Sequence, residues 1–388
     1  MAIYKLFPYK DTTLYSFYPD MNTGIDSIIE ISNLNIAVDL NPQVSRFFTE
    51  FVQSDIEDIV NNKIAGSQWD VNLKAFIATA QGIVESTDLS VHPLAQYWWN
   101  GTGTYLDEPQ VIDGANWYSP NFSGSVAWSS SGTDSTNHYV TSSYDATYVA
   151  AGGGSWYYSG SDGTLYAVTQ SFDTRSDKDL NVGVKTIVGN WYSSSLGLNT
   201  SASLPNYGFI VKWENTVEFN TNRTIQPLMQ FYSVDTNTIY PPQLEFKWKD
   251  FSNVLTGSLT SSIVSTTNLV SSLAENPGEF FPSSVNRFRF NVAPKYPIRT
   301  FQTASLFTGT NFLPTASYYA IKDLDTNEFV VDYDTTYTQI SSDGDGNYFD
   351  IYMNGLEPER YYKILVKTNI NGSTLILDDN YYFKVING

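Results

Sequence analysis

Short runs in which apolar and polar residues alternate are the feature of this sequence that most restricts its fold. Clear examples are residues 207–213, 244–248 and 287–292, and turn-forming Gly, Asn, Asp and Ser residues separate such runs along the chain. Alternation with a period of two places every second side chain on one face of a β-strand. Many short strands joined by turns predict an all-β chain built from sandwiches.

One segment departs from this pattern and predicts a short helix at residues 54–66. Ser54 and Glu57 have the spacing of a capping box, and Gly66 fits the position just after a helix end. The apolar residues that would form one helical face are Ile56, Ile59, Val60 and Ile64. We expect this helix to close one end of a sandwich.

Composition excludes several classes of protein. The 388 residues carry a net charge of −19 from only 16% charged residues, so the chain lacks the dense basic surface that nucleic acid binding needs. The absence of cysteine removes disulfides, thiolate metal sites and cysteine nucleophiles. No stretch of 18 apolar residues occurs and the first residues lack the apolar core of a signal peptide, so we expect neither membrane insertion nor export.

Changes of composition along the chain predict three regions. Residues 1–250 are expected to form a jelly-roll-like sandwich with the one short helix. Residues 251–285 are rich in β-branched and polar residues, with few aromatics, and are expected to be an extended connector that could donate a strand. Residues 286–388 are expected to form one or two small sandwiches, with a possible division near residue 305.

The C-terminal region contains the pattern of a tyrosine corner. Leu356, a turn at Pro358 and Tyr362 precede an alternating strand, an order that lets the tyrosine ring pack inside while its hydroxyl bonds back to the turn. The region therefore resembles a fibronectin type III or immunoglobulin-like domain. We assign these three residues a structural role.

Residues suited to catalysis or metal binding are scarce. His92 and His138 are the only histidines, and we expect both to be structural or solvated. The run from Asp343 to Asn347 is similar to the start of a calcium loop, but Tyr348 stands where such a loop needs glycine, so a tight Asp-Gly hairpin turn is the better interpretation. Gly152–Gly154 lack the lysine of a phosphate loop. We predict no catalytic residue, metal or cofactor.

Clustered aromatic residues are the candidates for binding. They are Tyr97, Trp98, Trp99, Trp117, Tyr118 and Trp156, which could contact a partner protein or stack on a sugar ring. Adjacent Trp98 and Trp99 should point to opposite faces, so one of them is expected in the core. The Ser-, Gly- and Tyr-rich residues 124–162 are expected to form exposed hairpin loops.

The first part of the chain resembles DNRLRE-type β-sandwich domains. The resemblance rests on residues 10–24 with their Asn22-Thr23-Gly24 turn, on 45–51, where Arg46 stands in the place of an arginine-led strand, and on the alternating strand 71–78. It also rests on 98–109, on 114–117 and on closing strands at 231–235 and 242–246. Phe47-Phe48 and an insertion after Trp128 depart from that pattern. The resemblance implies that Asp11 and the turn at Asn22 shape the first strand and have no catalytic role.

The chain as a whole, including residues 287–301, 316–334 and 355–372, also resembles virion structural proteins of contractile-tailed marine phages. This resemblance implies a non-enzymatic virion component, assembled in the host cytoplasm, which binds other virion proteins in the tail, neck or baseplate and is present in several copies. Two alternatives stay open: a virion adhesin that binds host glycans, and an enzyme that acts on polysaccharide.

Overall fold

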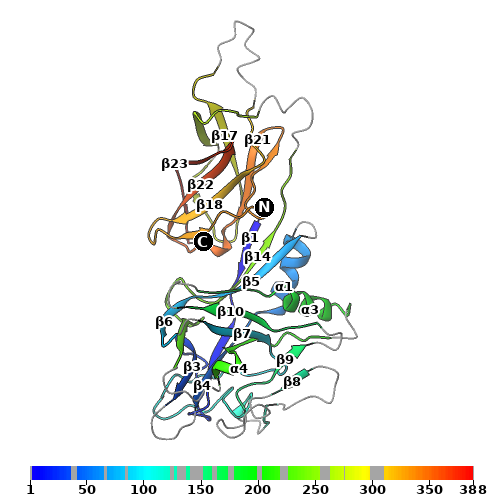
Figure 1. The fold of residues 1–388 in the computed structure, drawn as a ribbon, viewed down its shortest axis with the longest axis vertical. Coiled ribbons are helices and arrows are strands. Elements are labelled where there is room, and N and C mark those ends of the chain that lie inside the picture. Colours follow the sequence, from blue (N-terminus) through cyan, green and yellow to red (C-terminus); the bar gives the residue numbers. More distant parts are fainter. Residues whose placement is uncertain are drawn as a thin grey trace. The chain divides into compact units, whose positions relative to one another are not determined.

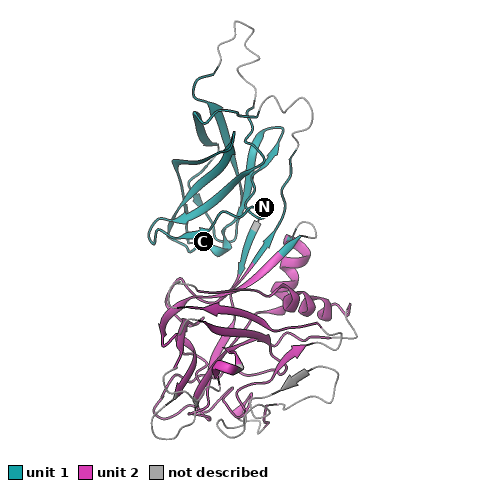
Figure 2. Ribbon diagram, in the orientation of Figure 1, with its two compact units in different colours: residues 1–5, 64–69, 246–388 teal, residues 6–63, 70–245 magenta. Residues whose placement is uncertain are grey.

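The chain forms two compact units in the computed structural model (Figures 1 and 2). Unit 1 comprises residues 1–5, 64–69 and 246–388, and unit 2 comprises residues 6–63 and 70–245. The structure describes residues 2–35, 42–64, 68–83, 86–122, 126–128, 137–139, 152–159, 164–173, 179–198, 203–218, 226–253, 263–274, 276–297 and 310–387. Both units consist mainly of β-sheets, so the expected all-β class is confirmed.

An eight-stranded sheet forms most of unit 2. Its strand order is β10 (Val168–Phe172), β7 (Thr87–Pro93), β12 (Phe209–Trp213), β4 (Pro42–Glu50), β3 (Ile28–Asn35), β13 (Leu228–Tyr232) and β6 (Ile77–Gln81), with β2 (Lys10–Tyr15) also paired to β4. A four-stranded sheet contains β1 (Ala2–Leu6), β14 (Gln243–Trp248), β5 (Trp69–Ala75) and β11 (Leu180–Gly183), and a small ribbon joins β8 (Asn137–Tyr139) to β9 (Trp156–Ser159). The division between the units falls inside β1, β5 and β14.

Strand β4 is covered on both faces. Phe47 and Phe48 point to opposite faces, and neither is exposed to solvent. The Phe47 ring packs on Phe231 at 5.5 Å between centroids, while Phe48 packs on Trp98 at 5.6 Å. The bulky pair that departs from the DNRLRE pattern therefore fills two separate parts of the core.

The predicted single helix needs two corrections. The helix begins one residue earlier, as α1 (Gln53–Asp58), and continues as the π-helical turn η1 (Ile59–Lys63). Val52 occupies the N-cap position without a side-chain bond, and Glu57 accepts a hydrogen bond from Gln53, so the proposed capping box is wrong. Ile56 and Ile59 are buried as expected, whereas Gly66 lies outside the described residues.

Besides the short 3-10 helix η5 (Met353–Gly355), two further α-helices of the described residues were not predicted. They are α3 (Lys185–Ser195) and the single turn α4 (Asn215–Glu218). Helix α3 buries Ile187, Val188 and Trp191, and the Trp191 ring packs on Phe209 at 4.6 Å. Since its β-branched residues and a glycine have low helix propensity, packing of this face stabilises the helix.

Unit 1 contains a sandwich with the immunoglobulin strand order. One sheet runs β15 (Leu269–Ala274), β17 (Val285–Pro294), β21 (Gly346–Tyr352) and β20 (Ser341–Asp343). The other runs β16 (Glu279–Phe280), β23 (Ser373–Val385), β22 (Tyr361–Ile370), β18 (Ser317–Asp323) and β19 (Phe329–Val331), with β16 parallel to β23. Lettered by their order along the chain, the strands of the first sheet are A, B, E and D, and those of the second sheet are A′, G, F, C and C′, as in an immunoglobulin-like domain.

A single hydrophobic cluster from Val264 to Val385 lies between the two sheets. Because β15 and β16 belong to these sheets, part of the expected connector at 251–285 is built into the sandwich. The possible division near residue 305 falls outside the described residues.

The tyrosine corner is confirmed. The buried Tyr362 donates its hydroxyl hydrogen to the backbone oxygen of Glu357 at 3.0 Å, and Leu356 is buried beside it. Burial raises the pKa of Tyr362 well above its ordinary value. The Pro358 turn thus holds the start of β22 in place, as the sequence predicted.

The Asp-Gly hairpin is also confirmed. Asp343 at the end of β20 pairs with Gly346 at the start of β21, which leaves a two-residue loop. The Asp343 carboxylate accepts two hydrogen bonds from Arg289, at 2.8 and 2.9 Å. This carboxylate therefore stabilises a turn against β17.

Candidate binding surface

A buried lysine in unit 2 organises the most prominent group of aromatic side chains. Lys10 lies on β2 and is only 4% exposed, and its Nζ is 2.9 Å from Glu50 Oε2 on the neighbouring β4. Its Nζ also donates to the backbone oxygen of Trp98 at 2.6 Å. Burial lowers the pKa of Lys10, and Glu50 opposes that change.

Three rings surround the Lys10 ammonium. Its Nζ lies 4.1 Å from the centroid of the Trp98 ring, 4.4 Å from Tyr97 and 5.3 Å from Tyr9. The Tyr9 hydroxyl donates to Glu50 Oε1 at 2.7 Å. Cation–π contacts of a desolvated ammonium stabilise such rings by about 2 kcal/mol, so Lys10 holds them in fixed positions.

Tyr9, Tyr97 and Trp99 present this group to solvent, and we call these three residues the aromatic platform. They are 48%, 42% and 48% exposed, and the Tyr97 and Trp99 rings meet edge to face at 4.8 Å. The backbone N–H of Trp99 donates to the backbone oxygen of Pro120 at 3.0 Å, and the backbone oxygen of Trp99 accepts from the N–H of Ala115 at 2.7 Å. The platform is therefore exposed but rigidly supported.

Asn22 fixes the segment that follows the platform. Its Nδ2 donates to the backbone oxygens of Asn100 and Ala115, and its Oδ1 accepts from the backbone of Gly103. At Gly24 a Cβ atom would lie 2.0 Å from the Asn100 oxygen, so a larger residue would displace the turn. The Asn22–Gly24 turn thus anchors the loop that carries Trp99.

The structure divides the six candidate aromatic residues into two groups of three. Tyr97, Trp99 and Tyr118 are exposed, whereas Trp98, Trp117 and Trp156 are at most 1% exposed. Trp98 is thus the core member of its pair, as predicted. The prediction that Trp98, Trp117 and Trp156 contact a partner or a glycan is wrong, because these three side chains are buried in the core.

The expectation of exposed loops across 124–162 is wrong for residues 152–157, which are buried. Gly152, Gly153 and Gly154 all have positive φ, and a Cβ at Gly153 would meet the Trp117 ring at 2.6 Å. Arg46 donates to the backbone oxygen of Gly153 at 2.8 Å. Only glycine allows the backbone to pack this closely against the core.

Sequence reasoning missed a buried ionic cluster beside this segment. Arg46 makes two hydrogen bonds to Glu218, at 2.6 and 3.0 Å, and Lys212 Nζ lies 3.3 Å from the same carboxylate. All three side chains are at most 1% exposed. Burial alone would raise the pKa of Glu218, but the two cations outweigh it and hold that pKa below its ordinary value.

His92 packs beside the cluster and is suited to a structural role. It is 2% exposed, and its ring lies 6.2 Å from that of Trp156. Burial, with the Lys212 charge in second place, lowers the pKa of His92 to about 3. The ring is therefore neutral at physiological pH. His138 lies on β8, but its side chain is outside the described residues.

Asp11 ties the first strands together. Its Oδ2 accepts a hydrogen bond of 2.7 Å from the backbone of Val234, which follows β13. The carboxyl is buried, and burial raises its pKa well above the ordinary value. The geometry suits the structural role that the DNRLRE resemblance implies.

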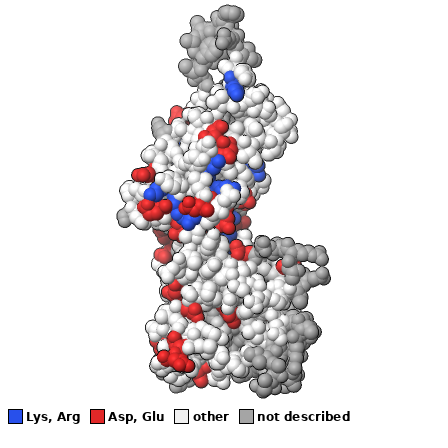
Figure 3. Space-filling view, turned by 90° about the vertical axis from the view of Figure 1, so that its left-hand side faces the viewer, with Lys and Arg blue, Asp and Glu red and all other residues white. Residues whose placement is uncertain are grey.

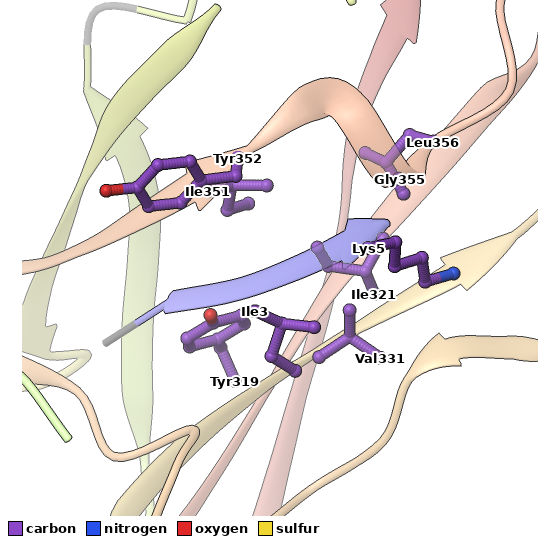
Figure 4. A pocket seen from close by; sticks show the side chains of 9 residues that line it. All are labelled: Ile3, Lys5, Tyr319, Ile321, Val331, Ile351, Tyr352, Gly355 and Leu356. Carbon is purple, nitrogen blue, oxygen red and sulfur yellow. The ribbon is translucent and has the colours of Figure 1, made fainter. Parts of the chain in front are cut away.

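A cavity of about 20 Å³ in unit 1 is lined by Ile3 and Lys5 of β1 together with residues of the sandwich (Figure 4), and it is large enough for one water molecule. Among the described residues, no group of three or more His, Asp or Glu side chains is arranged to hold a metal ion. No helix in the described ranges is both long and apolar enough to span a bilayer.

Comparison with known proteins gives no family for this chain. No protein family matches it, and no curated protein does. Among solved structures, the β-glucuronidase of Parabacteroides merdae has 8% sequence identity and a TM-score of 0.16, over 96% of this chain and 36% of that enzyme. The chain thus spans little more than a third of that enzyme's length, and a TM-score this low carries no argument about fold or activity.

Proposed function

We propose that this chain is a non-enzymatic structural component of a phage virion, which binds other virion proteins in the tail, neck or baseplate region. The observation that supports the proposal is the aromatic platform: three half-exposed rings, of which Tyr9 and Tyr97 lie against the buried Lys10–Glu50 pair and Trp99 packs on Tyr97. The assignment to a virion rests on the sequence resemblance alone.

The platform has the properties of an interface anchor. Tyr and Trp side chains dominate binding energy at protein interfaces, and rings that are already immobilised lose little entropy on binding. Three half-exposed rings offer roughly 300 Å² of apolar surface, which suits the centre of a larger interface of about 800 Å² per partner. We therefore expect the platform to form the central part of a contact with another protein.

Charged side chains are absent from the platform itself, which consists of Tyr9, Tyr97 and Trp99. Figure 3 shows a face on which uncharged side chains predominate and several basic side chains lie beside acidic ones. In unit 1, Arg287 pairs with Asp350 and Arg360 pairs with Asp323. At the platform, the Lys10 ammonium is likewise paired, with Glu50, so recognition by the uncharged rings is expected to depend on apolar and hydrogen-bond contacts.

The test is the solution mass of the purified chain, measured by light scattering, alone and after mixing with an extract of virion structural proteins. We expect the chain to enter a large, defined complex, and Trp99→Ala to weaken entry about 30-fold, as for a hot-spot residue worth about 2 kcal/mol. Tyr296→Ala, at a 74% exposed aromatic of unit 1, is the control and should enter normally. A wild-type chain that enters no complex would refute the proposal.

A second candidate function is a virion adhesin that binds host glycans. The exposed Tyr97 and Trp99 rings favour it, because aromatic faces bind the apolar face of pyranose rings. Binding to a glycan array that is lost in Trp99→Ala and kept in Tyr296→Ala would support this function. An array without binding, together with entry into a protein complex, would leave the assembly role alone.

A further inference from the structure

We infer that strand β15 of unit 1 pairs edge to edge with β15 of a second copy of this chain. The inference names a second copy of this chain as one partner in the proposed assembly. The pairing itself is argued from the structure, and only its biological role rests on the proposed function. Its starting observation is the contrast between β15 and the three other edge strands of the unit 1 sandwich.

Those three other edges are short or covered. Strand β16 has two residues, and β19 has three, with an irregular register against β18. Strand β20 also has three residues, and the chain at Ser252 and Asn253 runs along it, with a backbone bond from Ser342 to Ser252. Short, irregular or covered edges are the usual protection against pairing with other chains.

Within the part of the chain that the structure describes, strand β15 has none of these protections. It is six residues long and pairs with β17 in continuous register from Leu269 to Ala274. Because β15 is at the end of the strand order, the described residues hydrogen-bond to it as a strand on one side only. It contains neither proline nor a bulge nor a charged residue.

The free edge is also held in a fixed position. Ser271 accepts a hydrogen bond of 2.9 Å from the Tyr381 hydroxyl and also bonds to Asp379, both on β23 of the opposite sheet. A strand that is already ordered on one side presents its remaining backbone groups without further entropic cost. An added strand would complete these backbone hydrogen bonds.

The β15 edge is a place where a second copy can bind without charge repulsion. The chain carries a net charge of −19, so two copies repel each other over most of their surface. Residues 251–274, which end with β15, contain no Asp, Glu, Lys or Arg. Two β15 strands can therefore approach without opposing like charges.

Symmetry makes the pairing explicit. A twofold axis perpendicular to the joined sheets places antiparallel β15 strands side by side, with the same face of each sheet on the same side. The axis passes through a central serine, either Ser271 or Ser272. With the axis at Ser271, Val270 lies opposite Ser272 of the second copy; with the axis at Ser272, that serine lies opposite itself.

The double variant Val270→Lys/Ser272→Lys tests both registers, because either axis brings lysines directly opposite one another. Both positions are exposed, so the monomer should accommodate the change. The matched control is Thr374→Lys/Ile376→Lys on β23, where an exposed hydroxyl residue and an exposed aliphatic residue are likewise two positions apart. Both variants change the net charge equally.

We expect light scattering to show a dimer for the wild type and for the β23 control, and at least a tenfold weaker dimer for the β15 variant. Hydrogen exchange at concentrations above and below the dissociation constant should show concentration-dependent protection of outward amides in residues 269–274. Circular dichroism and thermal melting verify that each variant is folded.

Three outcomes would overturn the inference: a monomeric wild type, a β15 variant that dimerises normally, or equal disruption by the β23 control. If the wild type is monomeric alone and the β15 variant fails to enter the complex with virion proteins, then β15 binds a strand of another protein. The proposed assembly function can fail independently of this inference: the wild-type chain would then form normal dimers but would enter no complex with virion proteins.

Discussion

The buried cluster of Arg46, Lys212 and Glu218 can be tested sharply, because its three members should contribute unequally to stability. Two cations share one carboxylate, and all three side chains are buried. Burial lowers the pKa of Lys212, and Glu218 only partly offsets this effect. We therefore expect the lysine to be the dispensable member and the glutamate the essential one.

Glu218→Gln should strongly destabilise unit 2. The substitution keeps the side-chain size but removes the buried carboxylate that accepts two hydrogen bonds from Arg46 and lies 3.3 Å from Lys212 Nζ. Breaking a buried ion pair by removing one partner costs about 3–5 kcal/mol. Because a domain is stabilised by only about 5–15 kcal/mol, this is a large part of the total.

Lys212→Met should change stability far less. It removes an ammonium that is costly to bury, and it leaves the two hydrogen bonds between Arg46 and Glu218 intact. The losses are the bond of 2.9 Å from Lys212 to the backbone oxygen of Trp213, worth about 1 kcal/mol, and the longer bond of 3.3 Å to Glu218. The two terms roughly cancel, so we expect a net change within about 1 kcal/mol.

Urea unfolding followed by tryptophan fluorescence can measure both variants. The Trp117 and Trp156 rings lie 5.0 and 5.1 Å from the Arg46 guanidinium, so their emission reports directly on the cluster. Equal destabilisation by the two substitutions would refute the reasoning, since it would show that Lys212 is needed to balance charge. A folded and stable Glu218→Gln variant would refute it as well.

Three further predictions concern buried groups. Tyr362→Phe should lower the unfolding free energy of unit 1 by about 1 kcal/mol through loss of its corner hydrogen bond, whereas Tyr361→Phe, at an exposed ring, should leave it unchanged in thermal melts. The pKa of Asp11 is raised in the folded state. Its favourable contribution to the free energy of unfolding is therefore present below about pH 4 and is lost as the pH rises through that raised pKa. Asp11→Asn should therefore increase stability at pH 7 in urea unfolding, with the exposed Asp20→Asn as control. The pKa of His92 is lowered to about 3, so its favourable contribution to the free energy of unfolding is present above pH 6.5 and is lost on acidification towards pH 3. In urea unfolding at several pH values, His92→Gln should therefore lose less stability on acidification than the wild type.

Local patterns in the sequence predicted local structure well. The tyrosine corner at Tyr362, the hairpin after Asp343 and the opposite orientations of Trp98 and Trp99 each depend on residues that are close together in the chain. For these features the governing physics is turn geometry and side-chain alternation, which a few neighbouring residues determine. The contacts within them needed no knowledge of the rest of the fold.

Features that depend on distant residues could not be predicted. Arg46 and Glu218 are separated by 172 positions, and although Arg46 lies in the arginine-led strand of the DNRLRE resemblance, nothing in the sequence pairs it with Glu218. Helix α3 depends on burial of Trp191 against Phe209, which outweighs the weak helix propensity of its sequence. Gly152–Gly154 are typical of a loop by composition, yet their lack of side chains is what permits their close packing on Trp117.

Two buried cations of unit 2, Lys10 and Arg46, share one physical arrangement, and this arrangement bears on how the chain binds partners. Lys10 and Arg46 each lie against two or more aromatic rings and pair with a carboxylate on a neighbouring segment. A buried ion pair is weak support for stability in itself, but it fixes the geometry of the side chains around it. At Arg46 those side chains are core tryptophans, whereas at Lys10 two of the rings, Tyr9 and Tyr97, extend to the surface. The same device that orders the core at one place thus orders an exposed surface at the other, and a surface ordered before binding is what an interface requires.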